Sequence, residues 1–256
     1  MTKPVIPKLE YDLVDHCNLG CRSCIHNAQL KPKGELDINV IEEEFKVLFD
    51  KFDVERIILK GGEPLIHSNI VAVLTKIRRC LPQTTGLYVA TNGIKLATLP
   101  DHFFTIIKHL NIEFCISEYD ESTNYPKIYQ KLKEKQIPFS YEEKVIFYDF
   151  LDASGQQDPV ESFIECRKRK FFPLYRDKRF YLCCFVYDVP FMNGHLQTKI
   201  ESNSVSIDDD VQTILTYLSG HCSTCRFCSA YKKPHIWETQ RTYEKRELLP
   251  NNQVIL

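Results

Sequence analysis

The sequence lacks any apolar run of the roughly 18 residues that a membrane-spanning helix needs. Its first residues, Met1-Thr2-Lys3-Pro4, also lack the apolar segment of a signal peptide. An excess of one charge is missing too, because 33 Lys and Arg against 34 Asp and Glu leave a formal net charge of −1. These absences argue against a membrane protein, a secreted protein and a basic nucleic-acid-binding protein. We therefore expect a cytoplasmic protein whose partners are small molecules or a peptide.

Cysteine, by contrast, is abundant, with 11 in 256 residues. In a protein that is not secreted, so many cysteines argue for metal binding or catalysis. Three of them, Cys17, Cys21 and Cys24, have the spacing C-x3-C-x2-C directly after an apolar run. Three thiolates leave one iron of a [4Fe-4S] cluster open, whereas pure electron carriers use four. Zinc is the alternative, since His16 and His26 lie near enough in sequence to complete a four-ligand site.

A second motif, Gly61-Gly62-Glu63-Pro64, follows a stretch that is typical of a strand. Glycine lets the backbone approach a ligand closely while it turns out of a strand. Together with the cysteine loop, this motif resembles the radical S-adenosylmethionine (radical SAM) superfamily. The resemblance implies that the open iron binds the amino and carboxylate groups of SAM, and that the glycine motif receives the methionine amine. Ser23 departs from the family, many of whose members carry an aromatic residue before the third cysteine.

Strand-like and helix-like segments alternate over the first 150 residues. The expected strands are 9–14, 55–59, 85–91, 112–117 and 139–145, with 145–151 as a candidate sixth strand. Such alternation predicts an α/β fold with a parallel sheet and right-handed crossovers. The family resemblance implies a partial (β/α)6 TIM-type barrel, which we assign to residues 9–150.

Local features refine the expected helices. Asp37, Ser68 and Asp208 are each expected to cap a helix that begins a few residues later. The acidic run Glu42-Glu43-Glu44 is expected to form a solvated helix face.

Ligands of parallel sheets bind at the carboxyl ends of the strands, where Cys17, Gly61, Asn92 and Ser117 all fall. By the family resemblance, Asn92 and Ser117 lie along the ribose and carboxylate of SAM. The alternative is that both are turn and strand-end residues that satisfy backbone groups. Cys115 shares the parity of Ser117 and should point into the barrel, although most such cysteines are small core residues.

The chain changes character at a polar stretch, which predicts a linker at 151–160 and a second domain at 161–256. This half resembles the auxiliary-cluster (twitch) extension of radical SAM enzymes, a shortened SPASM domain. The resemblance implies that a second [4Fe-4S] cluster is held by Cys166, Cys183, Cys225 and Cys228. Zinc is again the alternative for four closed cysteines. Lys178 stands where the pattern usually has glycine, so we expect a different hairpin turn.

The resemblance also implies a reaction. SAM is cleaved reductively to methionine and a 5'-deoxyadenosyl radical, which abstracts hydrogen from the substrate. Similarity to twitch-bearing enzymes of sugar and aminocyclitol pathways favours oxidation of an alcohol, with the auxiliary cluster as electron acceptor. A low-potential donor such as flavodoxin or ferredoxin would supply the first electron. Glu142 and Glu143 on the fifth strand are candidates for the general base.

Three alternatives remain open. A radical epimerase would use Cys115, Cys184 or Cys222 as hydrogen donor. A peptide maturase would carry out crosslinking, and the few residues before the first strand count against it because such enzymes often carry a leader-binding domain there. A zinc-stabilised binding protein is the alternative from a different functional class.

Overall fold

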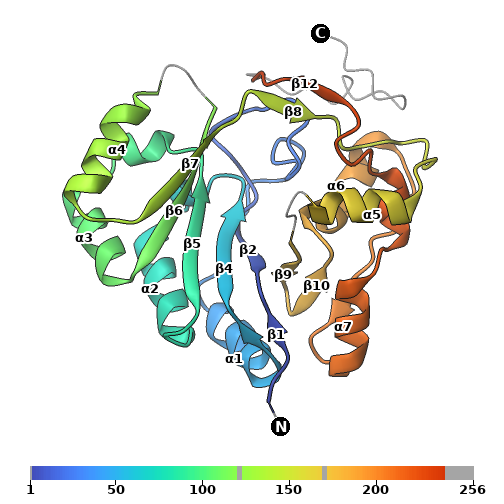
Figure 1. Ribbon diagram of the computed structural model, residues 1–256, viewed down its shortest axis with the longest axis horizontal. Coiled ribbons are helices and arrows are strands. Elements are labelled where there is room, and N and C mark those ends of the chain that lie inside the picture. Colours follow the sequence, from blue (N-terminus) through green and yellow to red (C-terminus); the bar gives the residue numbers. More distant parts are fainter. Residues whose placement is uncertain (1, 120–122, 169–171, 240–256) are drawn as a thin grey trace. The chain divides into compact units, whose positions relative to one another are not determined.

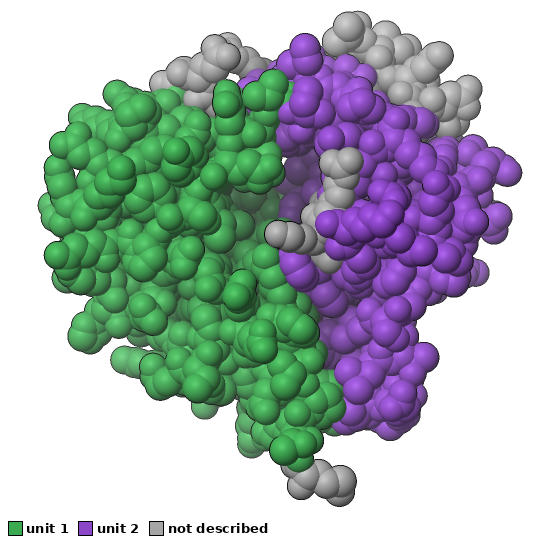
Figure 2. Space-filling view, in the orientation of Figure 1, with its two compact units in different colours: residues 1–18, 33–145 green, residues 19–32, 146–256 purple. Residues whose placement is uncertain are grey.

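The computed structural model describes residues 2–119, 123–168 and 172–239 (Figure 1). The chain divides into two compact units, which are coloured separately in Figure 2. The first unit comprises Met1–Asn18 and Lys33–Val145, and the second comprises Leu19–Pro32 and Ile146–Leu256. The cysteine loop therefore starts in the first unit and continues in the second. None of the described helices is long and apolar enough to cross a membrane.

The first unit is built on a parallel sheet with the strand order β2-β4-β5-β6-β7. Its strands are β2 (Leu9–Val14), β4 (Arg56–Gly61), β5 (Gly86–Thr91), β6 (Ile112–Glu118) and β7 (Phe139–Glu143). The helices that alternate with them are α1 (Ile41–Lys51), α2 (Ile70–Cys80), α3 (Asp101–His109) and α4 (Tyr125–Glu134). A short parallel pair, β1 (Val5–Ile6) with β3 (Asp53–Val54), completes the strands of this unit. The predicted α/β fold is confirmed.

The two faces of this sheet differ in chemistry, because successive side chains of a strand point to opposite faces. On β2, Leu9 and Tyr11 are fully buried, and the ring of Tyr11 lies 4.9 Å from that of Phe45 on α1. The alternate positions of the same strand are Glu10 and Asp12, which are also buried. One face of the sheet therefore packs its apolar residues against helices, and the other presents polar side chains.

Three predicted helix caps are wrong by one to three residues. The helices α1, α2 and α7 (Val211–Ser219) follow Val40, Asn69 and Asp210, in place of Asp37, Ser68 and Asp208. Asp210 accepts a hydrogen bond from the backbone N–H of Thr213 at 3.0 Å, as a cap does. Ser68 instead donates its hydroxyl hydrogen bond to Glu35. Several polar residues adjoin each helix start, and local sequence does not decide which of them takes the capping conformation.

The acidic run at the start of α1 is only partly solvated. Glu42 is exposed, as predicted for a solvated face, and it pairs with Lys76 of α2. Glu44, however, is 3% exposed and accepts a hydrogen bond from the hydroxyl of Tyr11. Since each helical residue turns by 100°, the third glutamate points toward the sheet, and the prediction is wrong for Glu44.

The second unit contains smaller elements. Its helices besides α7 are α5 (Pro159–Lys168), α6 (Cys184–Leu196) and the short 3-10 helix η3 (Ser223–Phe227). Its strands are β8 (Ile146–Tyr148), β9 (Leu174–Arg176), β10 (Arg179–Tyr181), β11 (Val205–Ser206) and β12 (Pro234–Ile236). Antiparallel pairing joins β9, β10 and β11, and separately joins β8 with β12.

Residues 145–151 do not extend the parallel sheet. The strand formed there, β8, pairs antiparallel with β12, which lies more than 80 residues later in the chain. A parallel neighbour of β7 would need a crossover of about a dozen residues, and only two residues separate β7 from β8.

The β9–β10 hairpin shows how the chain manages without the usual glycine. Its two turn residues, Asp177 and Lys178, have φ angles of 54° and 56°. Two consecutive left-handed residues are typical of a type I′ turn, which matches the twist of the flanking strands. Lys178 thus takes a left-handed conformation that glycine favours. Its Cβ makes this conformation less favourable than it would be for glycine.

Candidate functional site

The cysteine loop follows the end of β2, and backbone hydrogen bonds join its start to the end of β4. Gly62 donates its N–H to Val14 O at 2.9 Å, and Glu63 donates its N–H to His16 O at 3.0 Å. These bonds hold the first residues of the loop against the glycine motif, so the two motifs that are 40 residues apart in sequence form one structure.

The close approach explains both glycines. At Gly61, whose φ is +117°, a Cβ would lie 2.1 Å from Val14 O. At Gly62, a Cβ would lie 1.8 Å from His16 O and 2.9 Å from the amide nitrogen of Cys17. Any side chain would therefore push the cysteine loop away. The sequence predicts close approach to a ligand, and the structure adds a second reason, the approach of the chain's own backbone.

Glu63 connects the ends of two strands. Its carboxylate accepts hydrogen bonds from Thr91 Oγ1 at 2.6 Å, Asn92 N at 2.8 Å and Leu65 N at 3.1 Å. The side chain is 1% exposed, and Pro64 begins the short 3-10 helix η1 (Pro64–Ile66) that follows. Burial raises the pKa of Glu63 to about 7, although the three hydrogen bonds favour the charged form.

Asn92 lies beside the first cysteine. Its side-chain amide donates to Asn18 Oδ1 at 2.7 Å and lies 3.9 Å from Cys17 Sγ. The Tyr125 hydroxyl donates to Asn92 O at 3.0 Å, which fixes the turn after β5. The predicted proximity of the β5 end to the cysteine loop is therefore present in the first unit, and Asn92 also has the structural role of a turn residue.

The ends of β6 and β7 carry the remaining predicted residues of this unit. Ser117 is partly exposed and pairs in register with Glu142 of β7. Glu142 has an exposed carboxylate 2.5 Å from Lys144 Nζ, and Glu143 is exposed at the alternate position. Because neighbours on a strand alternate, Glu142 shares the face of Ser117 and Glu143 does not. Cys115 also lies on that face and is partly exposed.

The second and third loop cysteines belong to the second unit. Trp237 donates its indole N–H to Cys21 Sγ at 3.2 Å. Burial raises the pKa of the Cys21 thiol to about 12 and also raises that of Cys24. Sequence reasoning missed Trp237, and the one available signal was that this is the only tryptophan of the chain. Ser23, at the family's aromatic position, donates its hydroxyl hydrogen bond to Asp149.

The segment after Cys24 is anchored by a buried ion pair. Lys31 Nζ lies 3.0 Å from Asp188 Oδ1, and both side chains are fully buried. Asn27 donates to the other oxygen of Asp188 at 3.3 Å. Asp188 belongs to α6, so this helix holds the cysteine loop through a charged pair that the sequence does not indicate.

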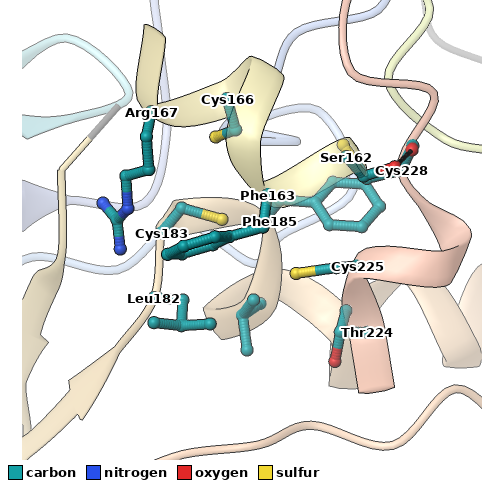
Figure 3. A pocket seen from close by; sticks show the side chains of 11 residues that line it. Ser162, Phe163, Cys166, Arg167, Leu182, Cys183, Phe185, Thr224, Cys225 and Cys228 are labelled. Atoms are coloured by element: carbon teal, nitrogen blue, oxygen red, sulfur yellow. Dashed lines mark hydrogen bonds between the residues drawn. The ribbon is translucent and has the colours of Figure 1, made fainter. Parts of the chain in front are cut away.

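A second group of cysteines surrounds a pocket in the second unit (Figure 3). Cys166 comes from α5, Cys183 directly precedes α6, and Cys225 and Cys228 lie in and after η3. Figure 3 shows the sulfur atoms of Cys183 and Cys225 directed into the pocket. These are the four cysteines that the twitch resemblance implies. Aromatic and aliphatic side chains complete the lining, together with Ser162, Arg167 and Thr224.

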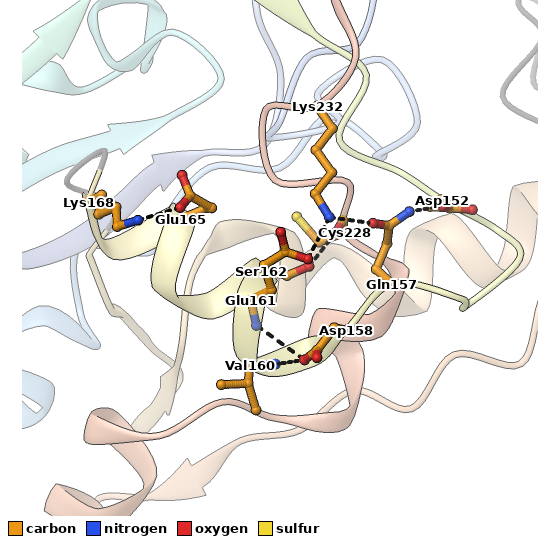
Figure 4. Close-up of polar contacts among 10 residues, drawn as sticks. All are labelled: Asp152, Gln157, Asp158, Val160, Glu161, Ser162, Glu165, Lys168, Cys228 and Lys232. Carbon is orange, nitrogen blue, oxygen red and sulfur yellow. Dashed lines mark hydrogen bonds and ion pairs between the residues drawn. The ribbon is translucent and has the colours of Figure 1, made fainter.

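Polar contacts fix α5 to the segment that carries the last cysteine (Figure 4). Asp158 caps α5 by accepting from Val160 N at 2.8 Å, and Ser162 donates to Cys228 O at 2.9 Å. Lys232 lies 3.0 Å from Glu161 on the same helix. The position of Cys166 on α5 is thereby tied to that of Cys228.

Four cysteines around one pocket are a donor set that fits an iron–sulfur cluster, and four thiolates also fit zinc. Burial raises the pKa of Cys183 well above its usual value and that of Cys228 to about 11, so thiolates here need a metal's charge. Within the described ranges, no three His, Cys, Asp or Glu side chains converge as one metal ion requires. Zinc holds its sulfurs about 2.3 Å from one centre, whereas a cuboidal cluster spreads four cysteines around itself.

The two spare cysteines lie outside this lining. Cys184 is 1% exposed, and its sulfur lies 3.8 Å from Ile25 O. Cys222 is 8% exposed and packs with Leu182 and Val186. Its sulfur is 3.9 Å from that of Cys225; a hydrogen bond between the two thiols lowers the pKa of Cys222 and raises that of Cys225.

Comparison with known proteins agrees with this geometry. Residues 11–136 match the family model described as "Radical SAM superfamily". Over 95 residues the chain is 34% identical to GTP 3',8-cyclase 3 of Mycobacterium bovis, a match that covers 35% of this chain and 25% of the cyclase. It is 36% identical over 96 residues to molybdenum cofactor biosynthesis protein 1 of Homo sapiens, covering 36% of this chain and 14% of that protein. The chain thus spans a quarter or less of the length of these relatives.

Among solved structures, the chain is similar to BtrN, crystallised in complex with AdoMet and 2-DOIA. The TM-score is 0.54 with 15% identity, and the alignment covers 89% of this chain and 94% of BtrN. At this identity the likeness shows a common fold. The fold extends over both units of the chain, beyond the residues that match the family model.

Proposed function

Because the chain belongs to the radical SAM superfamily, we propose that it cleaves SAM reductively and oxidises an alcohol of a small polar substrate, a sugar or aminocyclitol. The observation that carries the oxidation is the four-cysteine pocket of the second unit. We assign the SAM-binding domain to residues 9–150 and the auxiliary domain to 161–256. We further propose that the enzyme is cytoplasmic and receives its electron from a low-potential donor such as flavodoxin or ferredoxin.

Cys17, Cys21 and Cys24 would hold the first cluster, which supplies the electron that cleaves SAM. The backbone of residues 61–64 would receive the methionine amine, with Asn92 and Ser117 along the ribose and carboxylate of SAM. The packing of Gly61 and Gly62 against the cysteine loop supports this assignment, since it aligns the glycine motif with the first cysteine.

Oxidation of an alcohol removes two electrons and two protons from the substrate. One electron and one proton leave together as the hydrogen atom that forms 5'-deoxyadenosine. The hydroxyl proton needs a base, and the second electron needs an acceptor. Glu142 is the better placed of the two candidate bases, because it faces the same side as Ser117. A cluster held by Cys166, Cys183, Cys225 and Cys228 would accept the electron.

The proposal is tested with anaerobically reconstituted protein, SAM and dithionite. The substrate panel contains sugars, aminocyclitols and GTP, and 5'-deoxyadenosine is measured with the mass of each product. We expect substrate-dependent 5'-deoxyadenosine and a product lighter by two hydrogens. If SAM is cleaved neither with any substrate of the panel nor in the absence of substrate, the proposal is contradicted.

Other outcomes identify other reactions. A cyclised nucleotide from GTP would favour the reaction named for the curated relatives, with which 95 residues are 34% identical. Solvent deuterium in an otherwise unchanged product, lost on Cys115→Ala, Cys184→Ala or Cys222→Ala, would indicate an epimerase. Turnover of a peptide alone would indicate a maturase.

A further inference from the structure

A fifth thiol lies next to the four-cysteine pocket of the second unit. Cys222 directly precedes the 3-10 helix η3, and Cys225 lies within that helix. The sulfur atoms of these two residues are 3.9 Å apart. The proposed function assigns Cys225 to the auxiliary cluster, whereas it gives no role to Cys222.

The side chains around Cys222 are those that form the pocket. Cys222 is 8% exposed and packs against Leu182 and Val186. Both of these residues line the pocket, as Cys225 does. Cys183, which directly precedes α6, packs against the same apolar group. Cys222 is therefore in contact with the lining of the pocket, although it is not itself part of it.

The direction of the Cys222 side chain matters more than its burial. Burial by itself is ordinary, because a cysteine thiol packs like a small apolar group. Here, however, the sulfur approaches the sulfur of an assigned ligand. A backbone hydrogen bond from Cys225 N to Cys222 O, 3.0 Å long, holds the turn that brings the two thiols together. The contact is thus built into the local fold of η3.

A change of rotamer is enough to bring one sulfur close to the place of the other. Cysteine side chains occupy staggered χ1 rotamers, and a step from one rotamer to the next moves the sulfur by about 3 Å. The gap between Cys222 Sγ and Cys225 Sγ is only slightly larger than this displacement. The exchange therefore requires little movement of the backbone of η3.

We propose that Cys222 is a reserve ligand of the auxiliary cluster, which takes the place of Cys225 on the same iron when Cys225 is lost. Four thiolates close a [4Fe-4S] cluster, whereas three leave one iron open to other molecules. An electron acceptor is better closed, because an open iron binds small molecules directly. The pair of thiols keeps the cluster closed. This inference rests on the proposed function and concerns the ligands of its auxiliary cluster.

The test is the iron content of the full chain, reconstituted anaerobically, in a double-mutant cycle. Cys225→Ala and Cys222→Ala should each keep about eight irons per chain, because one thiol of the pair remains. The double variant should fall to about four. Electron paramagnetic resonance of the reduced samples should show the auxiliary cluster in both single variants, with its signal altered in Cys225→Ala.

Cys166→Ala is the matched control, since it removes a ligand that belongs to α5 and not to the η3 pair. It should contain about four irons. The inference is overturned if Cys225→Ala loses as much iron as Cys166→Ala, or if the double variant keeps as much as Cys225→Ala. Loss of iron in Cys222→Ala alone would also overturn it, because Cys222 would then be a required ligand.

Two further measurements keep these outcomes distinct. Thermal midpoints of the same samples separate the loss of a ligand from the loss of the fold, and Cys225→Ser, which preserves the size of the side chain, replaces an alanine variant that does not fold. About eight irons in the wild type with about four in Cys225→Ala would leave the proposed function intact. A wild type without the auxiliary cluster would overturn both the proposed function and this inference.

Discussion

At the scale of single residues, the glycine motif carries the sharpest constraint. Gly62→Ala places a methyl group 1.8 Å from His16 O, so the cysteine loop must shift. Overpacking of this kind costs about 1–3 kcal/mol of stability. We expect at least a 10-fold loss of SAM cleavage, measured as 5'-deoxyadenosine, together with lower iron content.

Gly194→Ala is the matched control for this substitution, because a Cβ there meets no atom within 4 Å. Gly194 lies in α6, where alanine is favoured over glycine by about 1 kcal/mol. The thermal midpoint should hold or rise, and cleavage should stay at the wild-type level. Equal loss in both variants would contradict the packing explanation.

Glu63 gives a prediction about pH. Its folded pKa of about 7 lies above the usual carboxyl value, so the folded state holds an extra proton between about pH 4.5 and 7. The stabilisation from this group is therefore fully present below about pH 4.5. As pH rises through 7, the free energy of unfolding falls by about 3 kcal/mol. Urea unfolding of the wild type and of Glu63→Gln across this range measures the free energy of unfolding of each. The wild-type value minus the variant value should fall toward higher pH, because only the wild type has a carboxyl that ionises. A constant difference would refute the assignment.

At the scale of elements, β12 and the residues after it supply a contact to the cysteine loop. The indole N–H of Trp237 donates to Cys21 Sγ, and hydrogen bonds to ligand sulfurs raise the potential of a cluster. Trp237→Phe should lower the reduction potential of the SAM-binding cluster by tens of millivolts while iron content is kept. Potentiometric titration followed by electron paramagnetic resonance measures the shift, and an unchanged potential would exclude the contact.

Helix α6 holds the loop through charge. Asp188→Asn leaves Lys31 buried without its countercharge, which costs about 3–5 kcal/mol of unfolding free energy. The double variant Lys31→Met with Asp188→Leu should recover most of this loss. Urea denaturation compares them with Glu42→Gln, which breaks the exposed pair with Lys76 and should cost much less, because solvent screens that pair. If Asp188→Asn and Glu42→Gln lower the free energy of unfolding by the same small amount, the buried ion pair does not anchor the loop.

At the scale of the whole molecule, the proposal requires two clusters in one chain. Anaerobic protein should contain about eight irons per chain, and Cys166→Ala should contain about four. Cys184→Ala is the control, since Cys184 is buried outside the pocket lining and should keep about eight irons. One zinc and no iron in the wild type would favour the zinc-stabilised alternative.

Cys17 and Gly62 illustrate what could be predicted from sequence. The strand before the cysteine loop, β2, has the predicted bounds, and the glycine motif follows β4 as expected. These features depend on neighbours in the chain: periodicity, turn chemistry and fixed spacing act over a few residues. The α/β class follows from them, because alternating strands and helices have few other ways to bury their apolar faces.

The tertiary structure decided the features that depend on distant pairing. Glu44 is buried because α1 turns it toward Tyr11, β8 pairs with β12 and not with β7, and Trp237 reaches Cys21 across more than 200 residues. Local sequence carries no information on such partners, since each contact is stabilised only after the chain has folded. The sequence by itself therefore determined the strands, the motifs and the family, and the tertiary structure decided which side chains meet around them.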